Sequence, residues 1–124
     1  MTDDTARVLA ALKTALGTEV SVTVAWPEQK AALPAAVLLP ARRIPACEAG
    51  GEILLTEITQ TVCLTARSFA ALNRMADQAE QAMRGLGYSL CEMSAENTPP
   101  RRMTMAFRSV TDGESFFIQQ GVRI

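Results

Sequence analysis

Arginine supplies most of the positive charge in this sequence, and its placement is the first feature that could serve chemistry or binding. Ten of the twelve basic side chains are arginines, and two adjacent pairs occur, Arg42-Arg43 and Arg101-Arg102. A guanidinium group is planar, pairs well with carboxylates and is enriched at protein interfaces. Our hypothesis is that Arg42, Arg43, Glu52 and Glu57 belong to an oligomer interface. If the two arginines lie opposite the two glutamates on a hairpin arm, the arm carries complementary charge for itself or for a neighbouring subunit. Ordinary surface charge explains the arginines equally well.

The carboxylates are the second set of residues that could do chemistry, because a pair of them can flank a bond to be hydrolysed. Four close pairs occur, which are Glu48 with Glu52, Asp77 with Glu80, Glu92 with Glu96, and Asp112 with Glu114. Each pair falls in a predicted loop or on the polar face of a predicted helix, so solvation is the preferred explanation. The chain has no histidine, which removes the usual base for a serine or cysteine nucleophile. We therefore predict no enzymatic activity, no cofactor and no metal site.

The three cysteines, Cys47, Cys63 and Cys91, do not form a Cys-x-x-Cys pattern. Their spacing indicates neither a disulfide framework nor a zinc site. Cys63 alternates within a predicted strand and is expected to be a small buried side chain, whereas Cys47 is expected in an exposed loop. The sequence assigns no function to any of the three.

Length and charge limit the classes of protein to which the chain can belong. Its 124 residues are 48% hydrophobic, which predicts a single domain over 1–124 with a modest core. The formal net charge of −1 disfavours a strong nucleic-acid interface. Apolar runs are far shorter than the ~20 residues that span a bilayer, which predicts no membrane contact. The acidic start of the chain does not resemble a signal peptide, so we expect a cytoplasmic protein.

Hydrophobic spacing in the first third predicts one helix and two strands. The helix begins behind Thr2 or Asp3 as N-cap and ends before Gly17. Alternation over 20–26 predicts a strand that ends at Pro27, and the run 35–44 predicts a second strand interrupted at Pro40.

A long strand follows, and it implies a projecting arm. Ile44 to Glu52 contains Pro45, Gly50 and Gly51, which is typical of a hairpin tip. Ile53 to Ala66 would extend over about 46 Å at about 3.3 Å per residue, more than a small domain can cover. Its second half alternates so that it can pack on a core, and its first half is expected to form one side of a protruding hairpin.

The second half of the chain predicts a helix and three more strands. Ser68 is the expected N-cap, and the helix ends near Gly85. Strands are expected over 88–93, 102–108 and 116–118. The predicted apolar stripe of the helix comprises Phe69, Leu72, Met75, Ala76, Ala79, Met83 and Leu86. The element order predicts an α+β fold in which two helices flank a mostly antiparallel sheet of about five or six strands, with a projecting β-hairpin arm.

The central region resembles the tail terminators and minor tail proteins of long-tailed phages and prophages. The resemblance rests on the block from Leu33 to Leu39, on the Gly50-Gly51-Glu52 turn, and on Ile58 to Arg67 followed by a helix rich in alanine, glutamine and acidic residues. It covers most of the chain in element order and about half of it in residue pattern, and it contains no signature motif. The segment from Phe116 to Ile124 departs from the pattern and has no assigned role.

The resemblance implies a structural role in phage assembly. Members of the family form hexameric rings that cap the tail tube, end its growth and provide the surface to which the head attaches. By resemblance, the partners would be further copies of the chain, the tail tube protein and a head-completion or neck protein. DNA would only pass through the ring, and the protein would move from the cytoplasm of a bacterial host into the virion tail. The arm, Ala41 to Glu57, would contact the adjacent subunit, and a loop at Glu92 to Arg102 would face the tube or the head.

Two other functions remain open on the sequence alone. A neck or tail-completion protein of the same assembly has a similar small α+β fold. A dimeric ferredoxin-like protein that binds a ligand or regulates would need a concave pocket lined by the sheet and the second helix. An enzyme that uses carboxylates ranks last.

Overall fold

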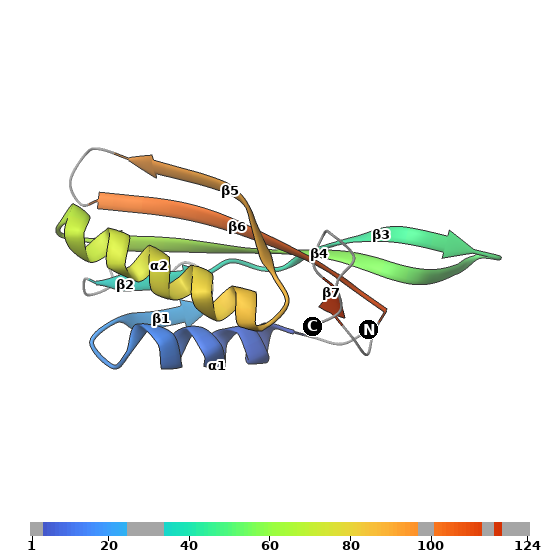
Figure 1. The fold of residues 1–124 in the computed structure, drawn as a ribbon, viewed down its shortest axis with the longest axis horizontal. Helices are drawn as coiled ribbons and strands as arrows, with labels where there is room; N and C mark the ends of the chain where they lie inside the picture. Colours follow the sequence, from blue (N-terminus) through green and yellow to red (C-terminus); the bar gives the residue numbers. More distant parts are fainter. Residues whose placement is uncertain (1–3, 25–33, 97–100, 113–115, 118–124) are drawn as a thin grey trace.

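The computed structural model describes residues 4–24, 34–96, 101–112 and 116–117, with the backbone alone for 47–49, 52–54 and 116–117. Its elements, in chain order, are α1 (Thr5–Leu16), β1 (Ser21–Val24), β2 (Ala35–Leu38), β3 (Arg42–Ala49), β4 (Glu52–Ala66), α2 (Phe69–Gly85), β5 (Ser89–Glu96), β6 (Arg101–Thr111) and β7 (Phe116–Phe117). The structure confirms the predicted α+β class with two helices (Figure 1).

Among the described residues, seven strands form one sheet, in the order β1-β2-β4-β6-β5, with β3 paired to β4 and β7 paired to β6. Neighbours are antiparallel except β1 and β2, which are parallel. The mostly antiparallel sheet is therefore as predicted. The extra strand is β3, because most of the segment expected to be the hairpin tip is itself extended.

The central strand β4 is 15 residues long and belongs to two regions. Thr56 to Ala66 pairs with β6, and Val62 to Thr65 pairs on the other side with β2. Glu52 to Thr59 pairs with β3. The outer ends of β3 and β4 extend well beyond the helices (Figure 1), which confirms the projecting hairpin. We call residues 41–57 the arm and the helix-covered remainder the body.

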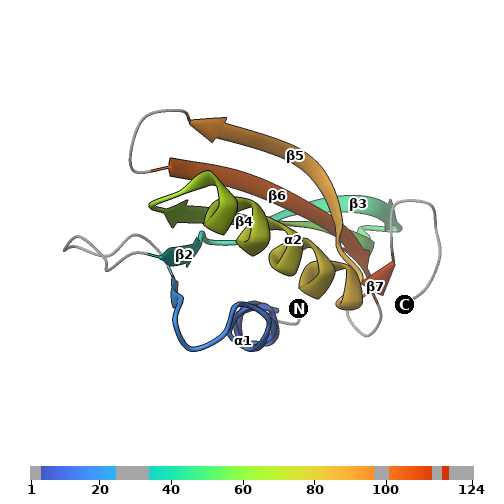
Figure 2. The same ribbon diagram turned by 60° about the vertical axis from the view of Figure 1, so that its left-hand side comes forward.

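Both helices lie on one face of the sheet, side by side (Figure 2). Alternate residues of β4 from Ile58 to Leu64 are fully buried on that face, including Gln60. α2 contributes Leu72, Met75, Ala76, Ala79 and Met83 to the same core, much as its predicted stripe required. Phe69 is the exception, since its side chain is 40% exposed and its ring centroid lies 4.2 Å from the guanidinium carbon of Arg101.

Helix boundaries follow local hydrogen bonding. Ser68 caps α2 as predicted, since its hydroxyl accepts a hydrogen bond of 3.2 Å from the backbone N–H of Ala71. The predicted cap of α1 was wrong. Its N-cap is Asp4, whose carboxylate makes no capping bond because it is held by other side chains. Thr2 and Asp3 lie outside the described residues.

Three loop predictions were also wrong. The hairpin tip is only the two-residue turn Gly50-Gly51, with φ of 59° and 83°, which suits a tight turn between antiparallel strands. Cys47 lies in β3 and not in a loop. Most of Glu92 to Arg102 is strand, because β5 continues to Glu96 and β6 begins at Arg101. Strand pairing along β6 extends these segments beyond what alternation alone indicated. The C-terminal strand is confirmed at Phe116–Phe117, and Ile118 lies outside the described residues.

Candidate functional site

The arm carries the four residues for which an interface role was predicted, but it does not place their charges opposite one another. Arg42 pairs in register with Thr59, and Arg43 pairs with Ile58. Glu57 lies opposite Ile44, and Glu52 lies opposite Ala49 beside the turn. Neither arginine therefore lies directly opposite either glutamate, so this condition for complementary charge across the hairpin is not met. The register is set by the two-residue turn at Gly50-Gly51, which places Ala49 opposite Glu52, and the irregularities after Pro45 and after Cys47 offset each other.

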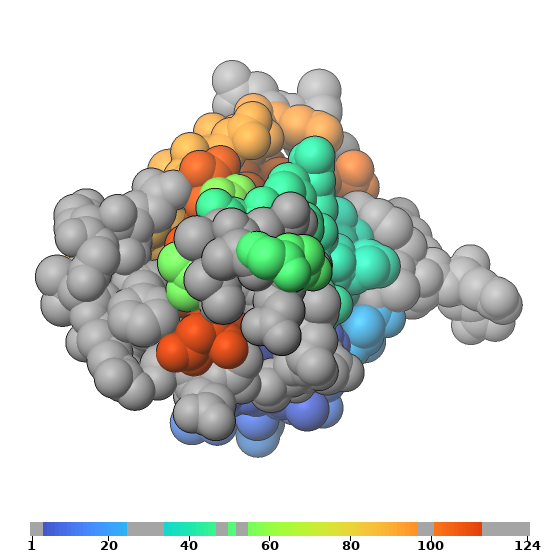
Figure 3. All heavy atoms as spheres, turned by 90° about the vertical axis from the view of Figure 1, so that its right-hand side faces the viewer, coloured from blue at the N-terminus to red at the C-terminus, as the bar shows by residue number. Residues whose placement is uncertain are grey.

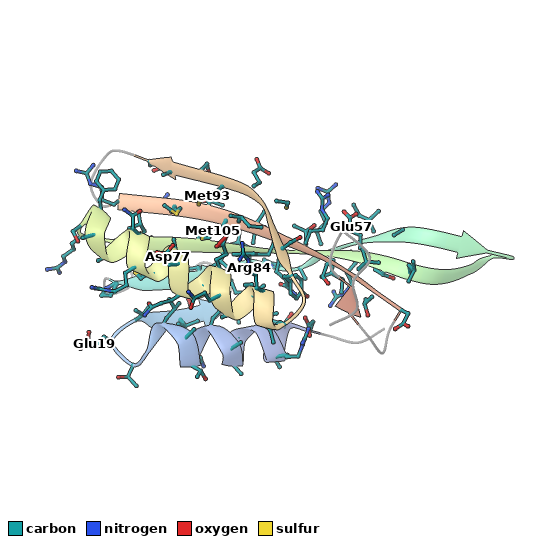
Figure 4. All side chains as sticks on the ribbon, in the orientation of Figure 1. Glu19, Glu57, Asp77, Arg84, Met93 and Met105 are labelled. Atoms are coloured by element: carbon teal, nitrogen blue, oxygen red, sulfur yellow. The ribbon has the colours of Figure 1, made fainter. Side chains whose placement is uncertain are left out.

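Glu57 has a different partner from the one expected. Its carboxylate Oε1 lies 3.3 Å from Nε of Arg108, which comes from β6 on the other side of β4. Both side chains are about one-third exposed, so water screens the pair. This ion pair joins the base of the arm, where Figure 4 labels Glu57, to the body.

The outer surface of β3 is exposed and partly apolar. Arg42 and Pro45 are exposed, and the side chain of Ile44 is 41% exposed. Arg42 and Ile44 are two residues apart in a strand, so both side chains lie on the same face. Figure 3, a view onto the end of the arm, shows residues of β3 at the molecular surface. Pro45 and the irregularities beside it disfavour regular pairing of another strand with this edge.

A groove runs between α2 and the β5–β6 edge of the sheet, with a volume of about 410 Å³. Its floor contains Met103 and Met105, which are buried, and its outer wall contains Met93, which is 54% exposed. Asp77 and Glu80 of α2 line the same groove. Figure 4 labels Asp77, Met93 and Met105, which come from α2, β5 and β6. The groove thus combines an apolar floor with an acidic rim.

A buried polar cluster ties the start of α1 to the start of β5, and sequence reasoning missed it. Asp4 is only 2% exposed, and its Oδ2 accepts hydrogen bonds from the Tyr88 hydroxyl at 2.6 Å and from Nη2 of Arg7 at 3.0 Å. Nη2 of Arg7 also donates to the carbonyl of Leu86 at 3.1 Å. Burial, and then the bond to Asp4, raise the pKa of Tyr88 well above its usual value. The bond to Asp4 likewise raises the pKa of Arg7.

This cluster has the character of a structural tie. The carboxylate of Asp4 accepts hydrogen bonds from both the guanidinium of Arg7 and the hydroxyl of Tyr88. Beside them, the hydroxyl of Ser109 donates a 2.7 Å hydrogen bond to the carbonyl of Gly87. The only signal in the sequence was the position of Tyr88 directly after the glycines that end α2. Nothing in the spacing of Asp4 and Tyr88, 84 residues apart, predicts that they meet.

The comparisons with known proteins identify the fold. No family model matches the chain, and no curated protein matches it. A chain from the solved structure described as the virion of a native gene transfer agent (GTA) particle has a similar fold, with a TM-score of 0.60. The two chains are 19% identical, and the similarity covers 83% of this chain and 87% of that one. The overall fold of this chain is therefore also found in a chain of that virion structure.

The candidate metal ligands and thiols were also located in the described part of the chain. Within it, no three histidine, cysteine or carboxylate side chains lie close enough to hold a metal ion. Cys63 is buried as predicted, with its sulfur 3.8 Å from the Thr104 hydroxyl, and Cys91 is exposed on β5. The side chain of Cys47 lies outside the described residues. No described helix is long and apolar enough to cross a membrane.

Proposed function

We propose that this protein is a structural component of a phage or phage-like particle that caps the tail tube as a ring, ends tube growth and provides the surface for head attachment. The observation that carries the proposal is the projecting arm on a small α+β body, in a fold shared with a chain of a gene transfer agent virion. Head-to-tail contacts between identical subunits close into rings when the rotation between them fits, and a projecting hairpin is suited to such a contact.

The further copies, the tube protein and a head-completion or neck protein are the partners that this role requires. DNA would pass through the ring without a specific contact, in keeping with the near-neutral net charge. Assembly would take place in the cytoplasm of a bacterial host, followed by incorporation into the tail. On this proposal the protein is not an enzyme. The contact roles of Arg42, Arg43, Glu52 and Glu57 remain part of the proposal.

The test measures both ring formation and tube length. Light scattering across a range of protein concentrations, with negative-stain imaging of large species, should show rings of about six subunits. Tubes polymerised from the tube protein of the same genome should be shorter and more uniform when this protein is present. Tubes whose length is unaffected by a saturating amount of the protein would contradict the proposal.

An arm-deletion variant provides the matched control. Pro45 and Thr56 are in register, so residues 46–55 can be replaced by Asn-Gly, which favours a two-residue hairpin turn. The shortened protein should keep its circular dichroism spectrum and form rings more weakly, because it loses the outer part of the arm and retains Arg42 and Arg43 at the base. A shortened protein that forms rings and caps tubes as the wild type does would confine the contact to the base of the arm.

A second candidate is favoured by one observation. The ligand-binding alternative needs a pocket lined by the sheet and α2, and the groove of about 410 Å³ has such a lining. Its volume is in the range of about 300–1,000 Å³ that small-molecule sites occupy. This candidate predicts a dimer at all concentrations and no effect on tube length, so the same measurements separate the two.

A further inference from the structure

We propose that the groove between α2 and β5 receives the base of the arm from a second copy of this chain, with Ile44 against Met93 and Arg42 beside Asp77. This inference rests on the proposed self-assembly and specifies the two surfaces that meet. On this inference, the groove is occupied by a segment of a neighbouring copy and not by a small molecule.

The donor surface is formed by two residues on one face of β3. Ile44 is one of four large hydrophobic side chains that are strongly exposed among the described residues. Arg42 lies two residues earlier on the same face, is exposed, and has no ion pair within the described part of the chain. An exposed apolar side chain beside an unpaired cation is a surface suited to an apolar site with an acidic rim.

The acceptor surface has the complementary arrangement. Met93, at 54% exposed, is another of those four hydrophobic side chains, and it stands over the buried floor formed by Met103 and Met105. Asp77 is exposed on the rim and makes no ion pair with any described residue. Glu80, by contrast, lies 3.7 Å from Arg84 on the same helix. Methionine side chains adapt their shape to an incoming apolar group, which suits them to line such a groove.

The two surfaces cannot meet within one chain. Arg42 is paired with Thr59, which alternates with the buried Ile58 and Gln60, so Arg42 and Ile44 lie on the sheet face away from the helices. Met93 is paired with Met105, which is paired with Val62, so the groove lies on the helix face. A contact between them must therefore join different copies, and it uses a different surface on each copy. Such a head-to-tail contact can propagate and close into a ring.

Charge reversal with complementation by mixing gives the first test. Arg42→Glu and Asp77→Arg should each weaken self-association, measured by sedimentation velocity, by at least about tenfold. A 1:1 mixture of the two variants should recover association, because each arm then meets a groove of opposite charge. Lys13→Glu and Glu19→Arg make the same changes at exposed sites on other surfaces and should leave association unchanged. Variants that associate like the wild type, or a mixture no better than the single variants, would overturn the proposal.

A cysteine pair gives the second test and does not depend on stable rings. Ile44→Cys in one copy and Met93→Cys in another, both with Cys47→Ser and Cys91→Ser, are mixed and treated with a short thiol-to-thiol crosslinker. Intact mass should show a mixed dimer in amounts well above those of a control that combines Ile44→Cys with Ala10→Cys on α1. An amount of mixed dimer no greater than in the control would overturn the proposed contact. This holds even if the protein is monomeric at every concentration.

The outcomes separate this inference from the proposed function. Rings by electron microscopy without the 44–93 crosslink would retain the capping role and reject this contact. The crosslink without rings or tube capping would retain the contact and reject the capping role. Loss of the crosslink when Arg42→Glu is added to the Ile44→Cys copy would confirm that charge complementarity contributes to the contact.

Discussion

One strand, β4, traverses two regions of this molecule that are held together in different ways. In the body, from Ile58 onward, every second side chain of β4 is buried under the helices, and the strand has neighbours on both sides. In the arm, β4 from Glu52 to Leu55 pairs with β3 alone, and the helices do not reach it (Figure 1).

This difference assigns separate tasks to the two regions. Burial of apolar side chains is the main source of folding stability, and it is concentrated in the body. A two-stranded hairpin by itself is at best marginally stable in water, so the outer arm adds little to the fold. Its exposed residues are therefore free to serve contacts with other molecules, and substitutions there should change assembly without changing stability.

The largest expected effect on stability comes from comparing a buried aromatic side chain of the body, Phe107, with an exposed apolar side chain of the arm, Ile44. Phe107→Ala removes a fully buried ring from the body and should lower the free energy of unfolding by about 3–5 kcal/mol. Ile44→Ala, on the exposed arm, should change it by less than about 0.5 kcal/mol. Urea unfolding followed by circular dichroism measures both. A loss of more than about 1.5 kcal/mol for Ile44→Ala would show that the arm contributes to the core.

The next effect concerns the buried tie between α1 and β5. Tyr88→Phe removes a hydroxyl that donates to the buried carboxylate of Asp4 at 2.6 Å, and should cost about 1.5–3 kcal/mol. Ser94→Ala, an exposed hydroxyl on β5, is the matched control and should be nearly neutral. Thermal unfolding at neutral pH distinguishes the two. If both variants melt alike, Tyr88 does not tie the helix to the sheet.

The same variant predicts a pH dependence. The pKa of Tyr88 is raised in the folded protein, whereas a tyrosine in the unfolded chain titrates near about 10. Above that pH the unfolded state loses its proton first and binds fewer protons than the folded state, so stability should fall as pH rises. Tyr88 is the only tyrosine, so Tyr88→Phe removes this contribution entirely. Parallel slopes of stability against pH above 10 in the two proteins would contradict the assignment.

A smaller effect is expected at the junction where β4 ends and α2 begins. Ser68→Ala removes the cap that bonds to the N–H of Ala71, which should destabilise the body by about 1 kcal/mol. Ser68→Asp can accept the same bond and should retain stability, which makes it the matched control. Unfolding in urea, monitored by helix ellipticity, checks both variants. An equal loss for alanine and aspartate would exclude the capping explanation.

Local patterns predicted the body well because its elements follow from short-range spacing. The alternation around Val62 identified the buried face of β4, and the stripe through Leu72 and Met83 identified the packed face of α2. Ser68 was recognisable as a cap from its type and position. The length of β4 alone predicted a projecting arm, since the strand is longer than the body can cover.

The pairing register and the long-range polar contacts could not be read from the sequence. Arg42 and Arg43 do not lie opposite Glu52 and Glu57, because the strands pair from a two-residue turn at Gly50-Gly51 and not across the longer tip that was expected. Asp4, to which the sequence assigned no role, accepts a hydrogen bond from Tyr88, 84 residues later in the chain. The groove likewise arises from α2, β5 and β6 together, and no single segment indicates it.

The smallest effect tests the boundary between the two regions, at the ion pair between Glu57 and Arg108. Because both side chains are about one-third exposed, the pair should contribute only about 0.5 kcal/mol, and less at high salt. A double-mutant cycle with Glu57→Gln and Arg108→Gln, measured by urea unfolding at low and high salt, isolates the coupling energy. A coupling above about 2 kcal/mol would mean that the base of the arm is fixed as strongly as the core. A coupling near the expected value would show that the arm joins the body mainly through the backbone of β4.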